Sequence, residues 1–322
     1  MNDLEKSIFY TIAWFDIFNF PLTAWEVYKF QIQDSRFEIQ GISFEFEKIQ
    51  RTLKESEALK EIVGYKHSFY FLKLRDELVK TRKERYIIAE KKYKKLLKIS
   101  RILAVIPFIR AIAAATGLSY SNSKKEDDLD LFIITAKNRI WLVRFFSILI
   151  LKLFRARPTI VNKKDKICLN FFITEENLNL EKIMLPEKNS LPDIYFIYWL
   201  VWLYPIYQEE NIWQEFIEAN NWLKNYFPNS FPQGPILRRT LILKPIGRLF
   251  KKFCEKIYAK SFGSLLGKTY RWLQIIMMPK NLKELANQST SVIINNKILK
   301  FHNQDKRGIY REKFYEKIRQ IN

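Results

Sequence analysis

Residues 108–135 read FIRAIAAATGLSYSNSKKEDDLDLFIIT. The apolar run Ile109–Ala115 is typical of a buried strand, and Gly117 marks a turn after it. A second strand is expected from Asp128, where acidic and apolar residues first alternate and an apolar run then follows. The two-residue period of a strand places Asp128 and Asp130 on one face. Because neighbouring carboxylates repel each other, a divalent cation such as Mg²⁺ or Mn²⁺ would stabilise the pair. The alternative for an isolated Asp-x-Asp is two solvated acids at a strand end.

The spacing of these features resembles a known family. Gly117 stands at the turn, and nine residues separate Leu118 from Asp128. Over about residues 109–174 the chain resembles the DNA polymerase β-like nucleotidyltransferase superfamily. The resemblance implies an α+β fold with a small mixed β-sheet as its core. It also implies that Asp128 and Asp130 hold Mg²⁺ (or Mn²⁺), which bridges the phosphates of a nucleoside triphosphate (NTP) while the turn cradles them. The acceptor of the nucleotidyl group is not identified, and both a nucleic acid and a protein stay open.

Several polar residues are candidate phosphate ligands around this pair. Ser119 and Ser121 lie just after the glycine, so their hydroxyls could donate to phosphate oxygens. Basic side chains would neutralise phosphate charge. The candidates are Lys124 and Lys125 in the loop and Arg139 and Arg144 on the helix expected over Asn138–Phe154. A plain loop surface is the alternative for the two lysines.

Two departures from the family pattern bear on catalysis. Position 118 is Leu where the family has Gly or Ser. The family also places a third carboxylate on a later strand, but the strand expected over Lys166–Thr174 has Asn170 at its centre. An amide oxygen can bind a metal but cannot take up a proton. Asp165 and Glu175 flank that strand and could replace the missing acid only if the register shifts. Both an active enzyme and a catalytically silent binding protein therefore stay open.

Residues 1–74 predict three helices and a hairpin, as in a winged-helix domain. Thr23 and Glu26 form a capping box, and Ser43 would cap the third helix. Two strand-like runs meet around Lys66–Ser68. The third helix is net acidic, which is unfavourable for contacts with DNA phosphates. We therefore expect protein contacts or a scaffold role here rather than sequence-specific DNA binding.

The rest of the chain predicts mostly helix around the core of residues 107–185. Residues 75–106 form a basic connecting helix, and residues 186–322 a mainly helical region with a hairpin near Asn295–Asn296. Residues 235–280 carry 11 Lys and Arg with one acid, interleaved with aromatic residues. That pattern suits RNA or single-stranded DNA, but an amphipathic helix with its aromatic residues in the core is the favoured interpretation.

Composition limits the class of protein. The chain has 322 residues, 48% of them hydrophobic, and a formal charge of +21 that attracts polyanions such as nucleic acid or anionic lipid. The longest apolar run, Ile194–Tyr207, is shorter than a membrane-spanning helix. Two cysteines build no disulfide framework, and the start of the chain does not resemble a secretory signal. We therefore expect a cytoplasmic protein without a transmembrane segment.

Overall fold

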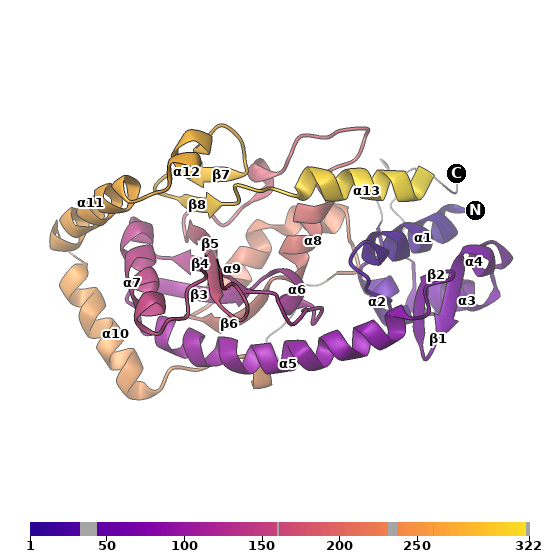
Figure 1. Cartoon of the computed structure of the whole chain (residues 1–322), viewed down its shortest axis with the longest axis horizontal. Helices are drawn as coiled ribbons and strands as arrows, with labels where there is room; N and C mark the ends of the chain where they lie inside the picture. The colour runs from indigo at the N-terminus through magenta and orange to yellow at the C-terminus, as the bar shows by residue number, and fades with distance from the viewer. Residues whose placement is uncertain (33–43, 160, 231–236, 260, 320–322) are drawn as a thin grey trace.

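The computed structural model describes residues 1–32, 44–159, 161–230, 237–259 and 261–319. Its centre is a six-stranded mixed sheet in the order β6-β3-β4-β5-β8-β7 (Figure 1). β3 is antiparallel to β4 and β6, β5 runs parallel to β4, and β8 is antiparallel to β5 and β7. The fold is thus mixed α/β around a mixed sheet, as expected. The strands of this sheet are β3 (Ile109–Ala114), β4 (Leu129–Thr135), β5 (Ile167–Thr174), β6 (Tyr204–Gln208), β7 (Val292–Ile294) and β8 (Ile298–Phe301).

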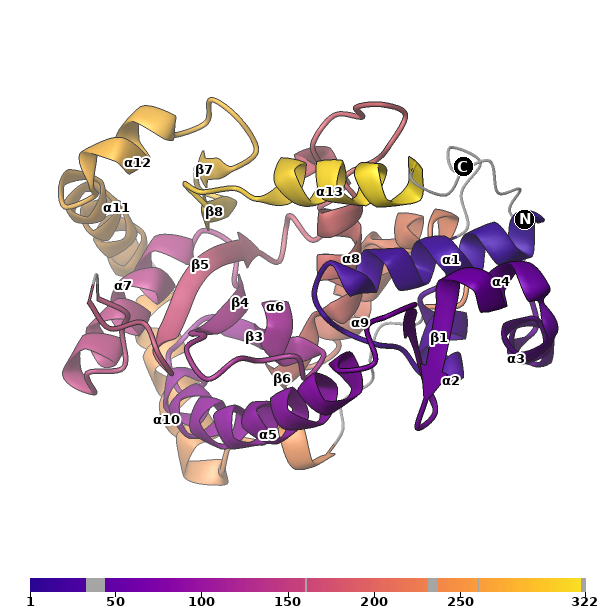
Figure 2. The same cartoon turned by 45° about the vertical axis from the view of Figure 1, so that its right-hand side comes forward.

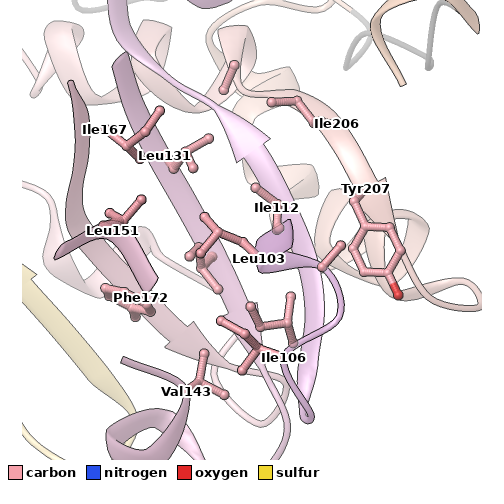
Figure 3. Close-up of a cluster of buried hydrophobic side chains, with 14 of the residues drawn as sticks. Leu103, Ile106, Ile112, Leu131, Val143, Leu151, Ile167, Phe172, Ile206 and Tyr207 are labelled. Atoms are coloured by element: carbon pink, nitrogen blue, oxygen red, sulfur yellow. The ribbon is translucent and has the colours of Figure 1, made fainter. Parts of the chain in front are cut away.

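Helices cover both faces of the sheet because alternate strand residues are apolar in both directions. On one face, Ile112, Leu131 and Phe172 pack with α5 (Leu78–Leu103) and α7 (Ile140–Leu153), as Figure 3 shows. On the other face, Phe132 and Phe171 pack with α8 (Ile194–Trp202) and α9 (Ile212–Ala219). Asp130 lies on the same side of β4 as Phe132, at the end where that strand begins.

The N-terminal region has the predicted hairpin, but it has four helices where the sequence predicts three, because residues 57–62 form a further short helix. The helices are α1 (Asp3–Asp16), α2 (Ala24–Lys29), α3 (Phe46–Glu55) and α4 (Glu57–Ile62), and the hairpin strands are β1 (Val63–Lys66) and β2 (Phe69–Leu72). The Thr23–Glu26 capping box is confirmed. His67 and Ser68 both have positive φ, the geometry of a tight two-residue hairpin turn. Ser43 lies outside the described residues.

The N-terminal region shares its core with the end of the chain. Trp14 of α1 stacks on Tyr198 of α8 at 5.2 Å between ring centroids and meets Phe314 of α13 (Arg307–Arg319) edge-on at 5.6 Å. In Figure 2, α1 and α13 both lie beside α8. This packing brings the first and last helices next to the beginning of β4.

The C-terminal region departs from the expected helical pattern. The apolar run Ile194–Tyr207 is not one helix, because α8 ends at Trp202 and β6 then joins the sheet beside β3. The late hairpin is confirmed as β7 and β8, and it also pairs with the sheet. Residues 107–185 thus supply three of the six strands, and the later region supplies the others.

The remaining helices are α6 (Thr116–Ser119), α10 (Pro245–Tyr258), α11 (Ser261–Ile276) and α12 (Lys280–Leu285). No helix in the described part of the chain is both long enough and apolar enough to cross a bilayer.

Candidate functional site

The two aspartates of the Asp-x-Asp motif converge as predicted. Asp128 immediately precedes β4 and Asp130 is its second residue, and Cys168 of the parallel strand β5 pairs with Asp130. One oxygen of each carboxylate and the Sγ of Cys168 all lie within 4.8 Å of one another. These three side chains form the Asp–Asp–Cys cluster. Three ligand-type atoms at this separation could surround a cation.

The electrostatics of the cluster indicate a deficit of positive charge. Burial, followed by the neighbouring Asp128, raises the pKa of Asp130 to about 7. Burial also raises the pKa of Asp128, and it raises the pKa of the Cys168 thiol, which both carboxylates raise further. The thiol is therefore protonated at neutral pH. A divalent cation would offset the repulsion between the two carboxylates.

The glycine turn is directly joined to this cluster. β3 leads into α6, whose first residue, Thr116, has φ of 55° and donates from Oγ1 to Oδ2 of Asp130 at 2.8 Å. A Cβ on Gly117 would lie 2.9 Å from the carbonyl oxygen of Asn122, closer than real Cβ atoms come. The amide of Asn122 donates to the Gly117 carbonyl at 2.7 Å. Glycine is therefore required at position 117 by close backbone approach.

Lys92 of α5 fixes the loop that precedes Asp128. Its buried ammonium donates to the carbonyl oxygens of Lys125 and Asp127 and to Oδ1 of Asp165. Lys95 binds the other oxygen of Asp165. Asp165 is thereby held in ion pairs, and it does not supply the missing third acid. Glu175 lies at the far end of β5, where it accepts from Arg110 and from the amide of Lys137.

Two cavities adjoin the turn. The first, which we call the turn cavity, has a volume of about 230 Å³ and is lined by Gly117, Ser119, Lys124 and Asp127 together with aromatic residues of α1, α8 and α13. The second, the tail cavity, has a volume of about 340 Å³ and lies between Asn170 and the segment that joins β8 to α13. The residues common to both are Thr116, Tyr195, Trp199 and Tyr310.

Aromatic side chains separate the two cavities. Tyr195 of α8 stacks on Tyr310 of α13 with ring centroids 5.0 Å apart and planes 7° from parallel. Asp128 and Asp130 do not themselves line either cavity, but Thr116, which binds Asp130, lines both. Trp14 and Trp202 line the turn cavity, and their buried indole N–H groups have no hydrogen-bond partner within the described part of the chain.

The predicted phosphate ligands divide into two groups. Gly117, Ser119 and Lys124 come together at the turn cavity. Ser121 does not line it, because its hydroxyl accepts a hydrogen bond from Arg239 at 2.9 Å. Lys125 is not among the lining residues either.

Arg139 and Arg144 are not brought to the aspartates. They follow the far end of β4, where Arg139 donates to the carbonyl of Ala259 and Arg144 donates to Oε1 of Gln274 beneath α11. Arg144 also lies 4.4 Å from the centroid of the Phe301 ring. Both guanidinium groups connect α7 to later helices. The prediction that Arg139 and Arg144 bind phosphate is therefore wrong.

The sequence predicts Asn170 opposite the two aspartates, at the place of the family's third carboxylate. The structure does not place it there. Cys168 pairs with Asp130, and the register of β4 against β5 shifts after this pair, so that Phe132 pairs with Phe171. Asn170 lines the tail cavity. The side chain of Asn170 forms a hydrogen bond with the Cys168 thiol. Cys168 was missed from the sequence, although the two-residue period already places it on the face of Asn170.

Comparison of the chain with protein-family models, with curated proteins and with solved structures gave no match. The function is therefore argued from the geometry of the site.

Proposed function

We propose that this protein is a Mg²⁺-dependent nucleotidyltransferase, which moves a nucleotidyl group from an NTP to an acceptor. The observation that carries the proposal is the convergence of Asp128 and Asp130 beside the Gly117 turn, joined to it by the Thr116 hydrogen bond. It also draws on the resemblance of residues 109–174 to the polymerase β-like superfamily.

The residues of the cluster fit a hard divalent cation. Two carboxylate oxygens are ligands that Mg²⁺ and Mn²⁺ prefer. Burial, together with the neighbouring Asp128, raises the pKa of Asp130, and a bound cation would favour its ionised form. Asp128 and Asp130 would hold the cation, which supplies neutralisation of phosphate charge when it is bound. A protonated thiol is a poor ligand for either ion, so Cys168 is assigned no role in holding it.

The turn cavity offers a place for the nucleotide. The Gly117 turn and Lys124 line a cavity whose other lining residues are partly aromatic and partly polar, among them Arg85, Asn122 and Asp127, which suits phosphates at one end and a base at the other. The tail cavity, beyond the Tyr195–Tyr310 stack, would receive the acceptor. The acceptor atom would bond to the α-phosphorus, and pyrophosphate would leave as the bond to the bridging oxygen breaks.

A second function is favoured by one observation. The residue paired with Asp130 is Cys168, whose thiol has a raised pKa, and no third carboxylate joins the cluster among the described residues. A protonated thiol cannot accept the proton of an attacking hydroxyl. The same fold would then bind an NTP without turning it over.

One experiment distinguishes the two functions. The full chain is incubated with α-³²P-labelled NTPs and Mg²⁺, and both label transfer and pyrophosphate release are measured alongside equilibrium binding of the NTPs. Mg²⁺-dependent pyrophosphate release that disappears in Asp128→Asn supports the enzyme. Mg²⁺-dependent binding without release supports the binding protein. Absence of Mg²⁺-dependent binding would overturn both.

A further inference from the structure

Helix α10 turns its charged side toward the protein. The buried Lys251 ammonium donates to the carbonyl of Ile109 and forms an ion pair with Oε1 of Glu209 at 2.8 Å. One turn later, Oε1 of Glu255 accepts from the amide of Phe108 and from Arg110. These contacts fix the rotation of the helix about its axis, because Lys251 and Glu255 are four residues apart on one face.

The opposite side of α10 is apolar and faces outward. Its residues recur at the spacing of one helical face. They are Ile246, Leu249, Phe250, Phe253 and Ile257, with exposed fractions of 84, 72, 54, 62 and 48%. The expectation that the aromatic residues of this segment lie in the core is therefore wrong for Phe250 and Phe253. Buried ion pairs rather than apolar burial determine how this helix docks.

Helix α11 extends the exposed apolar surface. Its inner side packs on α7, where Tyr270 stacks on Phe145 with centroids 4.2 Å apart. On its exposed side, Leu265 and Trp272 are each 63% exposed and Ile276 is 51% exposed. α10 and α11 form a V at the end of the molecule away from the N-terminal helices (Figure 1). We call the exposed apolar residues of the two helices the α10–α11 face.

The surroundings of this face are strongly cationic. Residues 235–280 contain 11 Lys and Arg against one acid. Arg239 and Lys251 are buried in ion pairs, and the acid, Glu255, is turned inward. The exposed cations Lys252, Lys256, Lys268 and Arg271 have no hydrogen-bond or ion-pair partner within the described residues. An apolar helix face bordered by free cations is the pattern of a helix that lies in the interface of an anionic bilayer.

We propose that the α10–α11 face docks on an anionic lipid bilayer. Charge decides between the candidate occupants. A second copy seated face to face would bring two segments of the same positive sign together, which is unfavourable. Single-stranded nucleic acid binds by stacking on planar groups, but the aromatic residues of this face are interspersed with aliphatic ones such as Ile246, Leu249 and Ile257. Anionic lipid offers both acyl chains for these side chains and negative headgroups for the lysines.

The test uses the full-length protein and vesicle flotation. Vesicles contain phosphatidylcholine alone or phosphatidylcholine with 30% phosphatidylglycerol. We expect binding to the anionic vesicles that weakens with added salt, and at least tenfold weaker binding to the neutral ones. The variant Phe250→Ser/Phe253→Ser should lose at least tenfold in partitioning, and Lys252→Gln/Lys256→Gln should lose severalfold. Because all four side chains are exposed, the variants should keep the circular dichroism spectrum of the parent.

Matched controls exclude general effects. Leu74→Ser removes an apolar side chain that is 94% exposed elsewhere, and Lys94→Gln/Lys98→Gln removes two exposed charges from α5. Both should bind anionic vesicles like the parent. The proposal is overturned if the parent protein fails to bind anionic vesicles, or if the α10 variants bind as well as the controls. It is equally overturned if sedimentation shows a dimer that Phe253→Ser dissociates while vesicle binding is absent. Nucleotide binding does not enter this readout, so its outcome is independent of the proposed function.

Discussion

The hydroxyl of Thr116 donates a hydrogen bond of 2.8 Å to Oδ2 of Asp130, and this bond joins the glycine turn to the Asp–Asp–Cys cluster. The donation lowers the pKa of Asp130 against the larger opposing effects of burial and Asp128. Thr116 also lines both cavities. A single side chain therefore contacts the candidate cation ligand and both candidate substrate sites.

Thr116→Ala should weaken Mn²⁺ binding by about tenfold at pH 7, in the range of the loss seen when a hydrogen-bond partner of a metal ligand is removed. Without the hydroxyl, the pKa of Asp130 rises further, so a proton competes more strongly with the cation. Thr116→Ser keeps the donor and should restore binding. Titration with Mn²⁺ monitored by electron paramagnetic resonance measures both. Equal affinity in the alanine and serine variants would show that the hydrogen bond has no part in the site.

Gly117→Ala should destabilise the protein by about 1–3 kcal/mol, because the new methyl group must push back the Asn122 carbonyl from 2.9 Å. NTP binding should fall with it, since the turn lines the cavity. Gly308→Ala is the matched control. No atom lies within 4 Å of the Cβ position there, and the residue is helical, so that change should be neutral or stabilise by about 0.5–1 kcal/mol. Urea unfolding compares the two. Equal stability of both variants would contradict the tight turn.

The difference in free energy of unfolding between the Asp130→Asn variant and the parent, which we call the stability gap, should depend on pH. Below the unfolded-state pKa of an aspartate, about 4, Asp130 is protonated in both states and the gap is small. Between that value and the folded-state pKa of about 7, ionisation occurs in the unfolded chain alone, so the parent loses stability as pH rises. In metal-free buffer the asparagine variant should be more stable by on the order of 4 kcal/mol at pH 8, because the two pKa values differ by about three units of about 1.4 kcal/mol each. Thermal unfolding of both proteins measures this stability gap. If it does not grow between pH 4 and pH 8, then the pKa of Asp130 is not raised in the folded protein.

Cys168→Asp places a third carboxylate opposite Asp130. Without a cation the variant should be less stable than the parent by about 1–3 kcal/mol, because three acids then share one buried region. Millimolar Mg²⁺ should raise its melting temperature more than that of the parent. Cys168→Ser, which adds no charge, should respond to Mg²⁺ like the parent. The prediction fails if Mg²⁺ raises the melting temperatures of the aspartate and serine variants equally.

The local elements of the site were predictable from the sequence. Apolar runs located β3 and β4, and period two placed Asp128 and Asp130 together. The Thr23–Glu26 capping box and the Asn295–Asn296 turn follow from short-range chemistry that a few neighbouring residues carry. Such features depend on little outside their own segment.

The walls of the site and the docking of α10 were not predictable in the same way. Tyr195 and Tyr310 are 115 residues apart in the chain, and no local pattern indicates that they stack. Cys168 lies opposite Asp130 because Leu129 pairs with Ile167, and this register depends on the pairing of two strands. The ion pair of Lys251 with Glu209 outweighs the usual burial of an apolar helix face, so the hydrophobic pattern of α10 predicted the wrong orientation.

Mn²⁺ binding to the full chain, counted by electron paramagnetic resonance in the presence of a non-hydrolysable NTP analogue, is the sharpest measure of the cation site. We predict that the parent and the matched variant Asp76→Asn, which removes an exposed acid far from the cluster, bind Mn²⁺ with the same affinity. Asp128→Asn/Asp130→Asn should bind at least about tenfold more weakly. If the double variant binds Mn²⁺ as tightly as the parent, or the parent does not bind it at all, then the two aspartates do not form a cation site.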